Sequence, residues 1–199
     1  MASSAAPYGL KPVNLVGGQP YAGSTRQIKI ASGYAANIYN GSVVSVVAAG
    51  TLEIVDEVGT NAAPFVAGTV GVFVGCSYTD PNTKQKLFSQ YWPSGTVAAD
   101  AVGYVVDDPD VVFQIQADDT LGQDALGINI PVVNPTAGST TTGNSTMAAD
   151  ASAIATTATV AFKIVDFVNS PTSSVGDAKT DILVKFNPSS HAYTAGTGI

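Results

Sequence analysis

Histidine and cysteine are almost missing from this chain of 199 residues, which holds one of each, His191 and Cys76. A single cysteine forms no intrachain disulfide, and a single histidine cannot build a metal site with several imidazole ligands. Cysteine–histidine catalysis would have to use this one pair. Because a lone cysteine after small and apolar residues is typical of core packing, we expect a structural Cys76 and a His191 that is exposed or at an interface.

Positive charge is scarce as well, since 8 lysines and arginines stand against 15 aspartates and glutamates, a net charge of −7. Binding to nucleic acid or to an anionic membrane requires clustered cations, so we expect neither partner. No apolar run approaches the length of a membrane-spanning helix. The first residues lack the basic and apolar regions of a signal peptide, which predicts cytoplasmic synthesis.

Motifs for nucleotide binding and for nucleophilic catalysis are absent too. Neither the P-loop pattern G-x-x-x-x-G-K-[ST] nor the dinucleotide pattern G-x-G-x-x-G occurs, so we expect no cofactor. The segment Gly75–Thr79 opens like the nucleophile elbow of a hydrolase but lacks the closing glycine that the sharp turn requires. We therefore predict that the chain is not an enzyme.

What the chain does contain is a succession of short β-forming runs separated by Gly, Pro, Asn, Asp and Thr. Helical periodicity is weak, with two short candidate helices at residues 118–126 and 148–155. Because this pattern is typical of all-β proteins, we predict an antiparallel β-sandwich or barrel, with a β-tulip-like form as one option. The predicted strands cover residues 27–30, 43–47, 51–55, 70–74, 86–92, 111–116, 128–133, 160–168 and 181–186.

Three positions carry turn or edge signals. Asn40-Gly41 stands between β-formers and predicts the type I′ turn of a hairpin. Ala49-Gly50 predicts a turn between the strands at 43–47 and 51–55. Pro131 has no N–H to donate, so it should confine its strand to a sheet edge or a bulge.

Two stretches have the composition of chain outside a packed core. Residues 1–20 combine prolines and glycines with spaced apolar side chains, which predicts an extended N-terminal arm followed by a β-rich body at 21–199. The polar loop at 134–146 is expected to be exposed and mobile, or to separate a C-terminal strand pair at 159–187. The arm is expected to dock on another surface through Pro7, Tyr8, Leu10, Lys11, Pro12, Val13 and Leu15.

An acidic cluster is the remaining candidate for chemistry. Asp107, Asp108 and Asp110 precede the strand predicted at 111–116. Carboxylates at strand ends can bind Ca²⁺, although this spacing fits no EF-hand, so the three residues are weak candidates for a Ca²⁺ site. Paired carboxylates could also serve a glycoside hydrolase. Aspartate is frequent in turns for local hydrogen-bonding reasons, and solvated turn residues are the interpretation that we favour.

Three segments resemble a known group of proteins. Pro7-Tyr8-Gly9-Leu10-Lys11-Pro12 resembles the P-[FY]-G-L-[KR]-P opening of small virion structural proteins in tailed phages, particularly marine podovirus-like ones. The segment 138–145, GSTTTGNS, is similar to their GSTTTG-x-S loop. Residues 162–168 and 181–193 resemble their closing pair of strands.

The resemblance implies a capsid decoration, or cement, protein that binds the outer face of the phage head and stabilises the shell. The implied partners are the major capsid protein and further copies of the chain, as a homo-oligomer with a trimer as one option. It also implies synthesis in the host cytoplasm and a final location on the capsid exterior. The alternative is a tail- or fibre-associated structural or adhesion protein of the same kind of particle.

Overall fold

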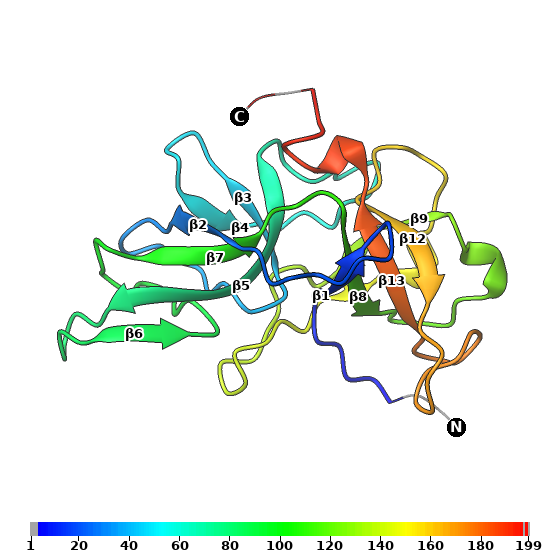
Figure 1. Ribbon diagram of the computed structural model, residues 1–199, viewed down its shortest axis with the longest axis horizontal. Helices are drawn as coiled ribbons and strands as arrows, with labels where there is room; N and C mark the ends of the chain where they lie inside the picture. Colours follow the sequence, from blue (N-terminus) through cyan, green and yellow to red (C-terminus); the bar gives the residue numbers. More distant parts are fainter. Residues whose placement is uncertain (1–3, 197, 199) are drawn as a thin grey trace.

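The computed structural model describes residues 4–196 and 198, which fold into an all-β sandwich (Figure 1). A five-stranded antiparallel sheet has the order β1-β8-β13-β12-β9. β13, which is near the C-terminus, lies at the centre of this sheet, and β1, which is near the N-terminus, lies at one edge. Segments from both ends of the chain therefore contribute to one sheet. The strands are β1 (Lys11–Leu15), β8 (Val111–Gln116), β9 (Asn129–Ile130), β12 (Phe162–Phe167) and β13 (Asp181–Phe186).

A six-stranded antiparallel sheet lies beside the first, on the left in Figure 1. Its order is β2-β7-β5-β3-β4, and β6 pairs with the far half of the long strand β5. The strands are β2 (Arg26–Lys29), β3 (Val43–Val46), β4 (Leu52–Ile54), β5 (Thr69–Thr79), β6 (Lys86–Ser89) and β7 (Val102–Val106). A small ladder of β10 (Val132–Val133) and β11 (Ala148–Ala149) completes the structure.

The two sheets are joined because strands of the six-stranded sheet serve two cores at once. Val72 and Val106 face the core of the five-stranded sheet, while their neighbours Phe73 and Val105 face a second core. Successive side chains of a strand point to opposite faces, so a strand covered on both sides reads as an unbroken apolar run. This explains the apolar stretch predicted as a buried strand at 70–74, which lies within β5.

The second core is built around Trp92, which is fully buried and meets Tyr78 edge-on at 5.4 Å between ring centroids. The six-stranded sheet curls around this core. Ile30, just after β2, forms an isolated parallel bridge to Leu52 of β4 and so brings the two ends of the sheet together. This single bridge does not pair β2 with β4 along their lengths, so among the described residues no closed barrel is formed, which decides between the sandwich and the barrel that the sequence left open.

Helices are reduced to single 3₁₀ turns in the described residues: Gln123–Ala125, Ala151–Ala153 and Pro188–Ser190. The helices predicted at 118–126 and 148–155 are therefore wrong. Gly122 has an extended backbone that starts the first turn, and Asp150 caps the second by accepting from the N–H of Ser152. In the described part of the chain, no helix has the length and apolar character required to cross a bilayer.

The hairpin predicted at Asn40-Gly41 is also wrong. Ser42 donates to the carbonyl of Tyr39 at 3.0 Å, and only Gly41 has a positive φ, +89°. This is a type II turn, whereas the type I′ turn of a tight hairpin needs positive φ at both central residues. The chain is therefore redirected rather than folded back on itself. By contrast, the turn predicted at Ala49-Gly50 does join β3 to β4.

Pro131 has the effect that its missing N–H predicts. It divides the run predicted at 128–133 into β9, which pairs with β12, and β10, which pairs with β11. The loop at 134–146 does not set off the strands at 159–187, because β12 and β13 lie between β8 and β9 in the same sheet. This loop is instead bonded to Asn40, which donates to the carbonyl of Gly143 and accepts from the N–H of Ser145.

Candidate interaction surface

The predicted N-terminal arm is a strand of the body. β1 pairs antiparallel with β8 at the edge of the five-stranded sheet, so the expectation that residues 1–20 stand apart is wrong for residues 11–15. Leu10 lies in the core and cannot contact a partner. The seven predicted contact residues differ in exposure: Leu10 is fully buried, Pro7, Tyr8, Pro12 and Leu15 are half-buried, and Lys11 and Val13 are exposed.

Side chains of the sheet hold the segment that precedes β1. Tyr8 donates its hydroxyl to Oδ1 of Asp181 at 3.1 Å. Burial, and then the charge of Asp181, raise the pKa of the Tyr8 hydroxyl above its ordinary value. Gln116 binds the backbone on both sides, accepting from the N–H of Ala6 at 2.8 Å and donating to the carbonyl of Ser4 at 3.2 Å. These contacts fix the segment on its own chain.

Gly9 is the point where segments distant in sequence meet. Its φ is +71°, and a Cβ there would come within 2.7 Å of the carbonyl oxygen of Gly41 and 2.8 Å of Cβ of Ser145. Its N–H donates to the carbonyl of Met147 at 3.2 Å. Residues 7–12 therefore pack directly against the 138–145 loop, and Tyr8 connects them to β13. The three segments that carry the resemblance form one contiguous unit.

The outer edge of β1 is a poor site for adding a further strand. Pro12 has no N–H, and the register shifts between Pro12 and Asn14 in a bulge at Val13. Proline and bulges are common devices that keep an edge strand from pairing with another chain. The ammonium group of Lys11 also lies over the Tyr8 ring, 4.0 Å from its centroid. Contacts made by this edge would have to come from side chains.

The three aspartates named as weak Ca²⁺ candidates point to different partners. Oδ2 of Asp107 forms an ion pair with Arg26. Oδ1 of Asp108 accepts from the backbone N–H of Asp110 at 2.8 Å, and Oδ1 of Asp110 lies 2.8 Å from Nζ of Lys185. In the described residues no cluster of three or more His, Cys, Asp or Glu side chains could hold a metal ion. The three weak Ca²⁺ candidates are therefore not gathered at one site, because neighbouring cations and a turn engage their carboxylates.

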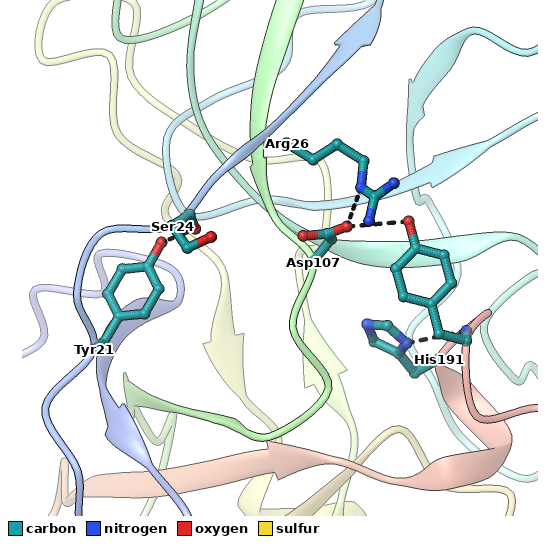
Figure 2. A network of polar contacts seen from close by, with 6 residues as sticks. Tyr21, Ser24, Arg26, Asp107 and His191 are labelled. Atoms are coloured by element: carbon teal, nitrogen blue, oxygen red, sulfur yellow. Dashed lines mark hydrogen bonds and ion pairs between the residues drawn. The ribbon is translucent and has the colours of Figure 1, made fainter.

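Asp107 is instead the centre of a polar network, shown in Figure 2. Besides pairing with Arg26 of β2, its Oδ2 accepts from the hydroxyl of Tyr193 at 3.1 Å. The Arg26 guanidinium also lies 5.4 Å from the centroid of the Tyr193 ring. Burial and the carboxylate of Asp107 raise the pKa of Tyr193. Three parts of the chain far apart in sequence are thus joined at the surface, a connection with no local sequence signal.

His191 lies beneath this network and is buried, so the expectation of an exposed or interface histidine is corrected. Its ring meets Phe186 and Tyr193 edge-on, and its Nδ1 accepts from the N–H of Tyr193 at 3.3 Å. Burial lowers the pKa of the imidazole despite the opposing charges of Asp107 and Asp108. The ring is therefore a neutral packing element of the C-terminal segment.

Cys76 and His191 lie in different environments. The thiol belongs to the Trp92 core and donates to the carbonyl of Tyr91 at 3.4 Å. Burial raises the pKa of the thiol to about 12, so it is protonated at neutral pH. Since the thiolate is the reactive form, the arrangement gives Cys76 the structural role predicted for it and no partnership with His191.

One exposed aromatic side chain lies outside the predicted N-terminal contact segment. Phe88 in β6 has 76% of its surface exposed, the largest fraction among the large apolar side chains of the described residues. It alternates with Leu87, which packs on the Trp92 core. The order Lys86-Leu87-Phe88-Ser89 indicates this exposure, because strand periodicity places Phe88 on the same face as the polar Lys86.

Comparison of the chain with protein-family models, with curated proteins and with solved structures finds no match.

Proposed function

We propose that this chain is a structural protein of a tailed-phage particle and that it decorates the outer face of the capsid. In this role it binds the major capsid protein, stabilises the assembled shell and carries out no catalysis. The observation that carries the proposal is the meeting of three segments at Gly9. The stretches that resemble virion structural proteins are packed on one another through Tyr8, Gly9 and Ser145.

This packing supports the proposal because a single structural contact explains why the three short motifs occur together in this chain. The glycine of the opening motif needs a positive φ and has no room for a side chain. The leucine that follows it enters the core, and the tyrosine before it reaches β13. Residues required together by one fold are a better sign of relationship than three unconnected matches would be.

Charge and repetition are consistent with a place outside the shell. A net charge of −7 would be repelled by packaged DNA on the inner face. A weak contact repeated over a symmetric lattice gains strength through multivalency. A protein that binds only the assembled lattice also stabilises it by mass action.

The test is to isolate the particles that carry the chain, count its copies by quantitative mass spectrometry and locate it by cryo-EM. We expect hundreds of copies distributed over the head. A few copies confined to the tail would instead support the tail-associated alternative, and absence from particles would refute both roles.

The exposed residues of β1 can be tested in the same system. Purified chain is added to shells that lack it, and occupancy is measured for Val13→Asp and for the control Val97→Asp. Both positions are exposed valines, but only Val13 belongs to the predicted contact segment. We expect Val13→Asp to reduce occupancy and Val97→Asp to leave it unchanged. Equal occupancy of the two variants would remove β1 from the contact.

A further inference from the structure

The outer edge of β6 has no neighbour in the part of the chain that the structure describes. β6 pairs with β5 on one side only, and in Figure 1 it is the outermost strand of its sheet. The exposure of its residues alternates, with Lys86 and Phe88 exposed and Leu87 and Ser89 half-buried. This strand therefore presents both a free backbone edge and an exposed aromatic ring.

The register shows which backbone groups point outward. The backbone N–H of Asp80 donates to the carbonyl of Gln85 at 2.9 Å, which makes these two residues a hydrogen-bonded pair. The backbone N–H of Thr79 instead donates to Oδ1 of Asp100, on the side away from β6. Hydrogen-bonded and non-hydrogen-bonded pairs alternate along an antiparallel ladder. Leu87 therefore bonds to β5, whereas the N–H and C=O groups of Lys86 and Phe88 point away from it.

Three other edge strands, β1, β2 and β9, are protected. β1 carries Pro12 and a bulge, and β2 carries Arg26 and Lys29 along its short length. β9 is covered by Ala155, which exchanges two backbone hydrogen bonds with Asn129. Such devices blunt pairing with other chains. β6 has neither a proline nor a bulge, and the charge of its one lysine is paired with Asp100 at 3.0 Å.

We propose that β6 pairs antiparallel with β6 of a second copy, about a two-fold axis at Leu87. In this register Lys86 of each copy lies opposite Phe88 of the other, and the outward groups of both residues form four interchain hydrogen bonds. Each lysine then meets an aromatic ring rather than a like charge, an arrangement that favours cation–π contact. The edge is thus complementary to itself, as a two-fold interface requires.

This inference goes beyond the proposed capsid role and does not depend on it, because it concerns the purified chain in solution. The test is sedimentation analysis of the wild type, Phe88→Lys, Phe88→Glu and the control Val97→Lys over a range of concentrations. Phe88→Lys opposes two lysines across the two-fold axis, whereas Phe88→Glu opposes a glutamate to Lys86. Like charges directly opposite destabilise a strand pair.

We expect a concentration-dependent dimer for the wild type and for Val97→Lys, and at least a tenfold weaker dimer for Phe88→Lys. Phe88→Glu should dimerise more tightly than Phe88→Lys, and high salt should reduce the difference. A wild type that stays monomeric up to about 1 mM, a concentration at which even weak pairing is measurable, would overturn the proposal. Equal dimerisation of Phe88→Lys and the wild type would do the same.

A measurement on the wild type alone guards against a variant that fails to fold. Amide hydrogen exchange at Lys86 and Phe88 should slow as protein concentration rises, because their N–H groups become bonded in the dimer. The amide of Leu87, already bonded to β5, provides the internal control and should show much less change. Exchange at Lys86 and Phe88 that does not respond to concentration would contradict the pairing.

Discussion

The two sheets differ in how they draw on the chain. The six-stranded sheet takes all its strands from one continuous stretch, β2 to β7, between residues 26 and 106. The five-stranded sheet combines β1, near the N-terminus, with β8 in the middle and β12 and β13 near the C-terminus. Pairing distant segments closes longer loops and costs more chain entropy before it is rewarded. The five-stranded sheet therefore depends on residues that hold the chain ends in place.

Both cores nevertheless contain side chains from the same two strands of the six-stranded sheet, β5 and β7. In β5, Val72 enters one core and Phe73 the other, and β7 repeats the pattern with Val106 and Val105. Removing packing from either core therefore weakens strands that support both. The different sequence separations of the paired strands should therefore affect how the structure folds. The two sheets should not have separate free energies of unfolding.

The largest expected effect comes from emptying one core at a time. Phe113→Ala in the core of the five-stranded sheet and Trp92→Ala in the second core each remove a fully buried ring. Each should lower the free energy of unfolding by about 3–5 kcal/mol. Both variants should keep a single transition in denaturant, followed by tyrosine fluorescence, because Trp92 is the only tryptophan, and by circular dichroism. Two separate transitions would show that the sheets are independent.

The same difference explains what could be predicted from the sequence. β8 and β13 have the predicted bounds of 111–116 and 181–186, because alternation within a strand is a local signal. β1 was missed as a strand since its partner lies about a hundred positions away, and prolines in isolation indicate extended chain. β7 is not recognisable from the sequence because Gly103 interrupts its apolar run. The glycine is needed for packing, since a Cβ at Gly103 would lie 2.8 Å from Cδ2 of Leu52.

The candidate site was predicted less well, for a related reason. The acidic residues before β8 were recognised, but Arg26 and Tyr193, which bind Asp107, come from opposite parts of the chain. Nothing near Asp107 in the sequence indicates these partners. The burial of His191 follows in the same way from packing on Phe186, which tail-like composition does not reveal.

The second prediction concerns the residue that holds the N-terminal end in place. Gly9→Ala should destabilise the protein by about 2–3 kcal/mol, because a positive φ is strained for alanine and the Gly41 carbonyl crowds the new methyl group. Gly18→Ala is the matched control, with φ +78° and no atom within 4 Å of its Cβ position. It should cost about 1 kcal/mol. Equal losses in chemical denaturation would mean that the three-segment contact contributes nothing.

The third prediction tests the C-terminal end, which spans both sheets through Ala192, bonded to the Thr69 carbonyl at 2.7 Å. Because the folded pKa of His191 lies below its ordinary value of 6.5, its contribution to stability is complete above that value. It is lost as pH falls through 6.5 toward the folded pKa, since the unfolded chain binds the proton more readily. NMR titration should place the ring pKa below 6.5, and His191→Gln should flatten the dependence of thermal stability between pH 7.5 and 5.5. A ring pKa above 6.5 would reverse the sign.

The smallest expected effect compares one interaction at the two chain ends. Tyr8 and Tyr193 each donate a hydroxyl to an aspartate at 3.1 Å, but Tyr8 is half-buried and Tyr193 has 49% of its surface exposed. Tyr8→Phe should cost about 1 kcal/mol, whereas Tyr193→Phe should cost less than about 0.5 kcal/mol, since water can replace an exposed bond and Asp107 keeps Arg26. Urea unfolding of the two variants measures both losses. If Tyr193→Phe proves the costlier change, the C-terminal network holds the sheets together more strongly than its exposure suggests, and the N-terminal contact is the weaker of the two.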